Sequence, residues 1–501
     1  MTLGRTILAL AMACTALAVA HLSSQPITFV IAGAQLADGT GAPLRAADVR
    51  VEGDTIAAVG DTARRSGDVV VDGAGLVLAP GFIDAHNHST EGLEREREAV
   101  TQVSQGVTTL AVGQDGSSPW PIAGYLARLR AAPPAVNVVV LAGHATIRTQ
   151  VMGQDYKRRA RTGDVARMRT LIDQAMAEGA FGLSSGLEYE VGSYADVEEV
   201  VEMARGAGAK GGYYISHIRD EADLSMDAIR EAIAIGERAR LPVQITHIKL
   251  GTVGVWGKAN EVVALVEAAQ KRGVDVTADA YPYLAWQSTP RVLVPNKKYD
   301  DPASVKRGLD DIGGARNVQI TRWAAYPQYV GRRLDEMARA EQISDVEAYI
   351  RFAADENGGM IGHAMIEDDL RVFYQQPWVM VASDGGIANN HPRGAGTFPR
   401  VLGRYVREAG WLTLPEAIRK MTALPAARMG LADRGRIAPG MKADLVLFDA
   451  ATVIDRSTFE QPRALATGIE RVWVNGELVW NGTAAAGALP GRVLTRRADR
   501  P

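Results

Sequence analysis

The middle of the chain repeats one pattern of apolar and polar positions. A short apolar run ends in polar residues and is followed by a stretch in which apolar and charged positions alternate with helical spacing. Parallel strands need helical crossovers, and closing the sheet removes its edges, so eight such units favour a closed barrel. The pattern predicts an α/β fold, a (β/α)8 TIM-like barrel, with strands at 81–88, 107–115, 136–144, 180–189, 213–221, 243–250, 274–283 and 379–386.

Both ends of the chain show a different pattern, in which short runs of alternating apolar positions are separated by glycine and aspartate turns. Near the C-terminus, Asn475-Gly476 has the composition of a two-residue hairpin turn. We expect the two ends to pair into one small β-sandwich domain, with the barrel inserted between them. The β-sandwich is expected to consist of residues 21–80 and 435–485. The barrel is expected at 81–434, and a C-terminal tail at 486–501.

One interval in the barrel is much longer than the others. The polar ends of most successive strands lie 27 to 32 residues apart, but 105 residues separate Asp279 from Asp384. This excess predicts an insertion at 286–350. An insertion after strand seven lies over the C-terminal mouth of a barrel, where active sites of this architecture are found. The insertion is therefore either a lid or a peripheral excursion with no part in catalysis.

The first 20 residues resemble a signal peptide. Arg5 precedes an apolar run from Ile7 to Val19, and Ala18-Val19-Ala20 has the small-x-small form of a cleavage site. The run is shorter than the roughly 20 residues that a membrane-spanning helix needs. We therefore expect cleavage of residues 1–20 and export, with periplasmic or secreted protein as the product. Lipid attachment at Cys14 is the alternative.

Composition limits the partners and ligands that are expected. The net charge is −3 and there is no basic run, so nothing points to a nucleic acid. Hydrophobic residues make up 47% of the chain and there are 52 glycines, as in a compact α/β protein. Cys14 is the only cysteine, so a chain cleaved after residue 20 has no thiol for a disulfide or a metal. We expect a small-molecule substrate and no stable membrane span after processing; the oligomeric state stays open.

Four histidines and one aspartate stand at predicted strand ends. His86 and His88 follow strand one on the same face, His217 and His247 end strands five and six, and Asp384 ends strand eight. In a closed barrel these ends converge on one cavity. Imidazole and carboxylate ligands suit a divalent ion, with zinc the first choice. A metal that activates water, together with a carboxylate that carries its proton, is the equipment for hydrolysing an amide or an ester.

Longer motifs carry a family resemblance. "GVTTLAVGQDGSSPWPI", "SHIRDEADLSMDAIREAI", "DVTADAYPYLA" and "HPRGAGTFPRVLGRYVRE" resemble the amidohydrolase superfamily and, within it, the N-acyl-D-amino-acid deacylases (D-aminoacylases). The similarity runs from about residue 26 to residue 482. It implies zinc-dependent hydrolysis of an N-acyl group from a D-amino acid. The D-stereochemistry comes from the resemblance alone.

The resemblance also assigns roles to the residues at the strand ends. It implies that His86 and His88 bind one metal ion, that His217 and His247 bind a second, and that Asp384 is the general base and then the general acid. One or two ions are compatible with this set. Several family members place a cysteine ligand in the strand-two motif, where this chain has Gln114-Asp115. We expect Glu188, at the end of strand four, to bridge the metals instead, with Asp115 as the alternative; an oxygen ligand in place of sulfur favours harder ions such as manganese.

Four further residues are candidates for holding the substrate's α-carboxylate. Lys249 lies two residues after His247 and faces the same way, and the family binds the carboxylate at the positions of Tyr281, Ser288 and Arg393. Surface ion pairs for the two cations and a core hydroxyl for Tyr281 are the simpler interpretations. A dipeptidase or a cyclic-imide hydrolase of the same fold is the alternative function.

Overall fold

The computed structural model describes residues 28–496 and contains the predicted barrel. Neighbouring barrel strands pair in parallel, and a parallel bridge between Asn87 and Gly385 joins the first strand to the last. The third strand is interrupted and counts as two segments, β8 and β9. The predicted signal peptide lies outside the described residues. The barrel strands are β6 (Phe82–Asp84), β7 (Val107–Val112), β8 (Asn137–Val140), β9 (Ala142–Gly143), β10 (Gly182–Gly186), β11 (Tyr213–His217), β12 (Val243–Ile245), β13 (Val276–Ala280) and β17 (Val379–Val381).

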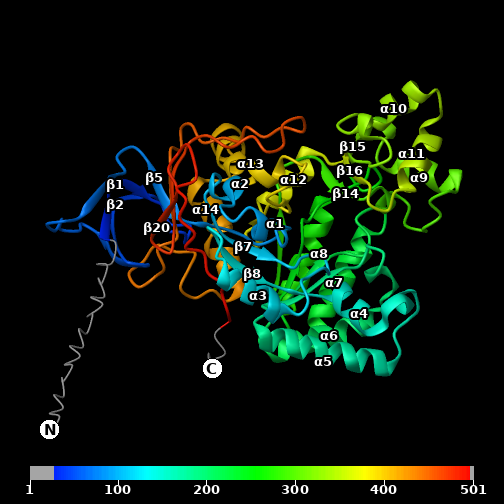
Figure 1. Cartoon of the computed structure of the whole chain (residues 1–501), viewed down its shortest axis with the longest axis horizontal. Helices are drawn as coiled ribbons and strands as arrows, with labels where there is room; N and C mark the ends of the chain where they lie inside the picture. Colours follow the sequence, from blue (N-terminus) through cyan, green and yellow to red (C-terminus); the bar gives the residue numbers. More distant parts are fainter. Residues whose placement is uncertain (1–27, 497–501) are drawn as a thin grey trace, which may run out of the picture.

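Helices cover the outside of the barrel (Figure 1). Helix α7 shows how the sequence selects its buried face, because Ile229, Ala232 and Ile233 recur at helical spacing and are buried, whereas Asp227 and Arg230 form an exposed ion pair. The helices of the barrel are α1 (Gly92–Arg95), α2 (Val100–Val103), α3 (Ile122–Ala131), α4 (His144–Met152), α5 (Thr162–Glu178), α6 (Val197–Ala209), α7 (Ser225–Ala239), α8 (Ala259–Lys271), α12 (Glu367–Tyr374), α13 (Arg393–Arg400), α14 (Leu414–Met421) and α15 (Ala423–Met429).

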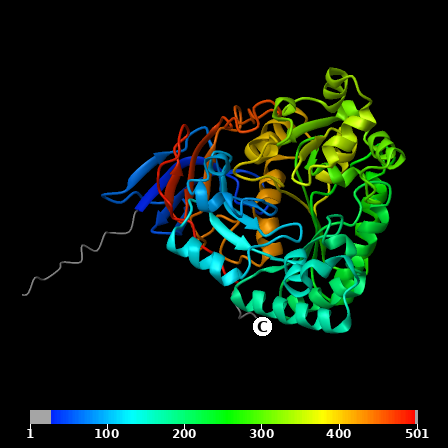
Figure 2. The ribbon, with the colours of Figure 1, turned by 45° about the vertical axis from the view of Figure 1, so that its right-hand side comes forward.

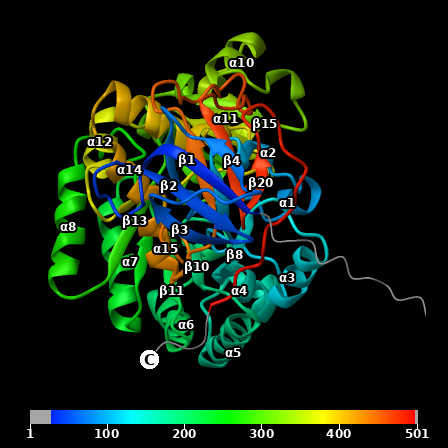
Figure 3. The same ribbon diagram turned by 90° about the vertical axis from the view of Figure 1, so that its left-hand side faces the viewer.

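The two ends of the chain together build the small β domain, as expected (Figure 3). Its strands form one hydrogen-bonded sheet, in which antiparallel pairing of β5 with β18 joins the N-terminal part to the C-terminal part. Asn475 and Gly476 both have positive φ between β19 and β20, which confirms the hairpin turn. The strands are β1 (Thr28–Leu36), β2 (Arg45–Glu52), β3 (Thr55–Gly60), β4 (Val69–Asp72), β5 (Val77–Pro80), β18 (Leu445–Phe448), β19 (Ile469–Val474) and β20 (Glu477–Trp480).

The predicted insertion forms a subdomain with its own hydrophobic core, on the side of the barrel away from the β domain (Figures 1 and 2). It extends to Gly362, beyond the predicted end at residue 350, because β16 completes a sheet by pairing with both β14 and β15. The elements of the insertion are β14 (Trp286–Ser288), α9 (Pro302–Asp311), β15 (Val318–Arg322), α10 (Leu334–Glu341), α11 (Asp345–Ala353) and β16 (Gly359–Gly362).

The described part of the predicted C-terminal tail packs against the barrel. The amide of Leu494 donates to the carbonyl of Val138, and the amide of Gly491 donates to that of Pro134, each at 2.9 Å. Residues 491–494 thus run along the beginning of the third barrel strand. Within residues 28–496, no helix has both the length and the apolar character needed to cross a bilayer.

A buried lysine in α14 gives the folded protein a specific dependence on pH. Lys420 donates to the carbonyl oxygens of Gln376 and Val379, and burial lowers its pKa to about 7 against the opposing effect of Glu416. In an unfolded chain lysine has a pKa of about 10.4. Between about pH 7 and pH 10 the unfolded chain binds the proton more strongly, so the free energy of unfolding contributed by Lys420 rises with pH.

We therefore expect the stability of the Lys420→Met variant, compared with that of the native protein, to be highest near pH 7. The midpoint of its thermal unfolding, measured relative to that of the native protein, should fall as the pH is raised from about 7 to about 10, because neutral methionine never requires deprotonation. A difference between the two midpoints that does not change with pH would contradict this account.

Candidate metal centre

The four histidines predicted at strand ends meet inside the mouth of the barrel. The Nε2 atoms of His86 and His88 are 3.2 Å apart, because alternate residues of the extended segment after β6 face the same way. Nδ1 of His217 lies 3.0 Å from Nε2 of His247. The rings of His86 and His247, with centroids 5.0 Å apart, join the two pairs into one cluster.

Asp384 lies against the first pair of histidines. Its Oδ1 atom is 3.1 Å from Nε2 of His88 and 3.5 Å from Nε2 of His86, and its Oδ2 atom is 2.5 Å from Nη1 of Arg393. A positive φ of 48° after β17 turns its carboxylate toward the cluster. Burial alone would raise the pKa of Asp384, but the charges of Arg393 and of the histidines outweigh burial and hold this pKa far below its usual range.

Asp115 occupies the centre of the cluster. Its carboxylate oxygens lie 3.4 Å from Nε2 of His86, 3.4 Å from Nε2 of His88 and 3.9 Å from Nε2 of His247. Together, ligand atoms of His86, Asp115, His247 and Asp384 all lie within 4.8 Å of one another. Such a set can surround one cation.

Glu188, expected to be the bridging ligand, lies to one side of this group. Its Oε2 atom is 2.8 Å from Nε2 of His217, and its Oε1 atom accepts a bond from the amide of Glu221. The geometry therefore favours Asp115, the alternative named from the sequence, over Glu188 for the bridging position. The physical reason is a turn after β7, in which Gly113, Asp115 and Gly116 all have positive φ and aim the Asp115 side chain into the barrel.

Two carboxylates at the site were given no role from the sequence. Glu221 forms a second candidate ligand group with His217 and His247, and its Oε1 atom is 3.0 Å from Nδ1 of His247. Its position four residues after His217 was the available signal. Asp279 accepts the amide of His247 at 2.8 Å and lies 3.7 Å from Nδ1 of His86, so it orients two candidate ligands from behind.

Of the four residues expected to bind the substrate's carboxylate, Lys249 and Ser288 line the pocket above the cluster, whereas Arg393 and Tyr281 are not among its lining residues. Arg393 and Lys249 are only 4% and 6% exposed, so neither forms a surface ion pair. The guanidinium of Arg393 also lies 4.8 Å from the ring centroid of Tyr281, and Nζ of Lys249 donates to Glu221 at 2.6 Å. Ser288 lines the pocket, and its buried hydroxyl has no hydrogen-bond partner among the described residues.

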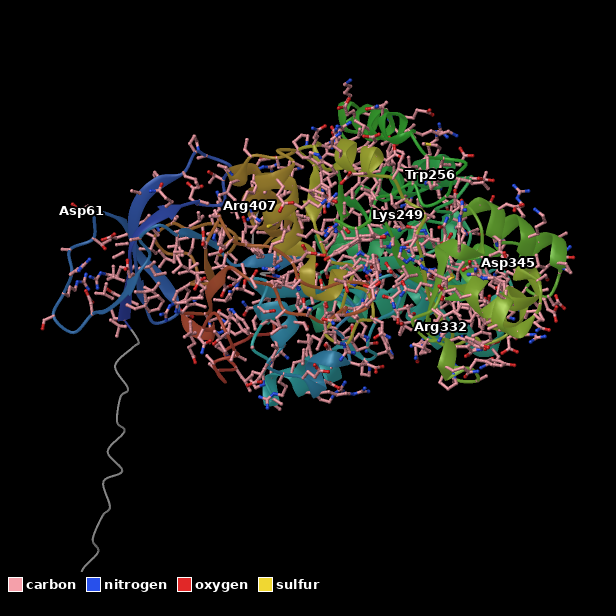
Figure 4. The ribbon with its side chains drawn as sticks, turned by 90° about the horizontal axis from the view of Figure 1, so that it is seen from above. Asp61, Lys249, Trp256, Arg332, Asp345 and Arg407 are labelled. Carbon is pink, nitrogen blue, oxygen red and sulfur yellow. The ribbon has the colours of Figure 1, made fainter. Side chains whose placement is uncertain are left out.

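A pocket opens directly over this cluster. The insertion forms one wall of the pocket, so it is part of the site's surroundings and not a remote excursion. Figure 4 shows Asp61 near one end of the molecule and Asp345 of the insertion toward the other, with Lys249 between them. The lining residues are Glu188, Tyr189, His217, Glu221, Ala222, His247, Lys249, Gly251, Thr252, Trp286, Gln287, Ser288, Val292, Leu293, Pro295, Asp311 and Asp384.

His144, the first residue of α4, belongs to a buried cluster outside the metal centre. Its Nε2 atom is 2.9 Å from Oε1 of Glu199 in α6, and Arg148 pairs with the other oxygen of the same carboxylate. All three side chains are buried. The cluster ties α4 to α6.

Removal of this buried carboxylate should destabilise the fold. Glu199→Ala leaves the Arg148 guanidinium buried without its partner, and breaking such a pair costs about 3 to 5 kcal/mol. We expect a lower midpoint of thermal unfolding and an unchanged metal content. Glu198→Ala, which removes the exposed partner of Arg238, is the matched control. Native stability with loss of bound metal would instead assign the cluster to the site.

Comparisons with known proteins agree with this architecture. The sequence pattern of the amidohydrolase family (Amidohydro_3) matches residues 69–480, and the chain belongs to this family. A D-aminoacylase of Alcaligenes xylosoxydans xylosoxydans is 40% identical over 95% of this chain and 99% of its own length.

Two solved structures resemble the whole fold. A D-aminoacylase with a binuclear metal centre is 38% identical and superposes with a TM-score of 0.85, covering 94% of this chain and all of that one. The N-acyl-D-glutamate deacylase of Bordetella bronchiseptica, solved with zinc and a phosphonate that mimics the tetrahedral intermediate, is 34% identical with a TM-score of 0.86 and the same coverage.

Proposed function

We propose that this protein is a zinc-dependent hydrolase that cleaves the amide bond of N-acyl-D-amino acids and releases a carboxylate and a free D-amino acid. One observation carries the proposal. A buried cluster of histidines and carboxylates lies in the same barrel mouth as two buried cations, Arg393 and Lys249. The cluster of histidines and carboxylates is suited to amide hydrolysis, and the two cations are suited to binding a substrate that carries a carboxylate. The D-configuration rests on the related deacylases.

The residues of the cluster fit a divalent cation. Oδ1 of Asp115 is buried and makes no hydrogen bond to the described residues, and imidazole nitrogens face one another across the cavity. Burial alone would lower the pKa of His217, but Glu221 and Glu188 raise this pKa to about 9. This surplus of carboxylate charge favours a cation. We assign His86, His88, Asp115 and Asp384 to one zinc ion, and His217, His247 and Asp115 to a second.

Bound zinc supplies Lewis acidity, which polarises the amide carbonyl and lowers the pKa of water. The chain's own residues handle the proton. Asp384 takes a proton from the attacking water and delivers it to the amide nitrogen as the carbon–nitrogen bond breaks, so the amine leaves neutral. Arg393 holds Asp384 in place before substrate arrives.

Arg393 links substrate binding to the affinity of Asp384 for a proton. The α-carboxylate of the substrate offers the guanidinium a second partner, which weakens its hold on Asp384 and raises the affinity of Asp384 for a proton. Lys249 and the unpartnered hydroxyl of Ser288 complete the carboxylate site. Tyr281 acts through Arg393, by packing against its guanidinium.

A panel of N-acetyl-D- and N-acetyl-L-amino acids tests this proposal. Zinc-loaded protein should release free amino acid from D-substrates and at least about tenfold more slowly from L-substrates, since the carboxylate site fixes the hand of the substrate. Faster release from the L-forms would contradict the stereochemistry. No release from either form, with zinc bound, would contradict the activity and favour a dipeptidase or a cyclic-imide hydrolase.

We also propose that the protein is exported. The support is the sequence of residues 1–20, with its apolar run and small-x-small site. N-terminal sequencing of protein purified from the producing cell should find a chain beginning near residue 21. An intact N-terminus in the cytoplasm would contradict export, and a lipid on Cys14 would contradict cleavage after Ala20.

A further inference from the structure

The pocket has a region away from the metal ligands that combines apolar walls with a free carboxylate. Val292, Leu293 and Pro295 of the insertion line the pocket together with Trp286, which is 7% exposed. Asp311, the last residue of α9, lines the same pocket. Its backbone carbonyl accepts the amide of Val253 at 2.8 Å, which fixes the end of α9 against the loop after β12.

The carboxylate of Asp311 is not neutralised by the cations around it. Among residues 28–496, no ion pair or hydrogen bond to this carboxylate is formed, whereas the nearby cations are engaged elsewhere. Arg307 pairs with Asp223 at 3.2 Å, and Lys306 pairs with Asp310 at 2.6 Å. Burial, followed by the charge of Asp223, raises the pKa of Asp311. Arg307 opposes this rise without cancelling it, so a cation placed beside the Asp311 carboxylate would favour its charged form.

Thr252 supplies a second polar group in the same pocket. It is 4% exposed, and its Oγ1 atom has no hydrogen-bond partner among the described residues. A buried hydroxyl without a partner is unusual in a folded protein, and Thr252 is one of the residues that line this pocket. A ligand group that donates hydrogen bonds can satisfy Thr252 and Asp311 together.

An acidic ligand group has no corresponding partner. Lys249 is the one lysine or arginine among the lining residues, and it is already paired with Glu221 and assigned to the α-carboxylate. A second carboxylate in the substrate would lie near Asp311 without a cation to offset the repulsion. This contrasts with the D-glutamate deacylase named above, which acts on a substrate with an acidic side chain.

We infer that this site selects N-acyl-D-amino acids with a long side chain ending in a positive charge, such as D-lysine and D-arginine, and rejects acidic ones. The aliphatic stem packs on Val292, Leu293 and Pro295, and the cationic end donates to the carboxylate of Asp311 and the hydroxyl of Thr252. The inference rests on the proposed deacylase function and specifies its substrate class.

Three substrates separate the inference from the function on which it depends. N-acetyl-D-norleucine has the stem of lysine without the charge, so it reports deacylation itself. The native enzyme should have a kcat/KM for α-N-acetyl-D-lysine about tenfold above that for N-acetyl-D-norleucine and at least about 100-fold above that for N-acetyl-D-glutamate. Asp311→Asn should lower the ratio of lysine to norleucine about tenfold, and Thr252→Val should lower it less.

Asp310→Asn is the matched control, because Asp310 is exposed, pairs with Lys306 and does not line the pocket. It should leave the ratio at its native value. Turnover of norleucine with a ratio that Asp311→Asn does not move, or a preference for D-glutamate, would overturn the inference and keep the deacylase. Absence of turnover for all three D-substrates would overturn the deacylase and the inference with it. A fall in the ratio for Asp311→Asn that Asp310→Asn does not share would support both.

Discussion

Asp384→Asn should lower kcat for an N-acetyl-D-amino acid by about 1000-fold or more. General acid and base catalysis contributes about 100- to 10,000-fold, and an amide cannot accept the proton of water at neutral pH. Asparagine keeps the size of the side chain and one oxygen 3.1 Å from the His88 imidazole, so the site should remain assembled. The measurement is kcat at saturating zinc, with the metal content of the same preparation determined in parallel.

A matched substitution separates chemistry from folding in this experiment. Asp164, in the first turn of α5, is a buried aspartate that pairs with Arg158 and Arg167 away from the pocket lining. Asp164→Asn should reduce stability, because it weakens ion pairs with Arg158 and Arg167, and should leave kcat within about twofold of the native value, because Asp164 does not line the pocket. If Asp384→Asn retains native kcat with zinc bound, another residue moves the proton.

Asp115→Ala should remove the bound metal. Asp115 lies within 3.4 Å of both His86 and His88, and its loss leaves the two halves of the histidine cluster without a shared anion. Loss of even a supporting residue costs about 10- to 100-fold in metal affinity, and loss of a ligand should cost more. The metal content after dialysis and the activity should fall together.

Asp115→Cys provides the corresponding rescue. Thiolate is a strong zinc ligand, and the cysteine side chain is no larger than the aspartate that it replaces. We expect this variant to keep zinc, and to bind manganese less well than the native protein because sulfur is the softer ligand. Glu188→Ala should retain the metal of the first group. Loss of metal in Glu188→Ala but not in Asp115→Ala would restore Glu188 as the bridging ligand.

The pattern of apolar runs was sufficient to predict the barrel, because each strand must be buried on both faces and each crossover must bury one helical face. It also placed His86, His217 and His247 correctly, since the C-terminal ends of barrel strands converge whatever the loops do. The pairing of the chain ends was predictable for a similar reason: each end alone exposes too much apolar sheet surface.

Side chains that depend on a turn could not be placed in the same way. Whether Asp115 or Glu188 points inward is decided by positive φ angles after β7, and one sequence does not show them. Glu221 and Asp279 were visible at strand ends, but their contacts with His247 come from the barrel's closure. The insertion's end at Gly362 depends on non-local pairing of β16.

Zinc titration of metal-free protein is the most direct test of the central claim. Protein stripped of metal by a chelator should release no D-amino acid from N-acetyl-D-norleucine, and turnover should return as zinc is added, with the signal saturating at one or two ions per chain. Turnover that survives complete removal of metal would contradict the account, as would zinc bound at the site without turnover of any N-acyl-D-amino acid.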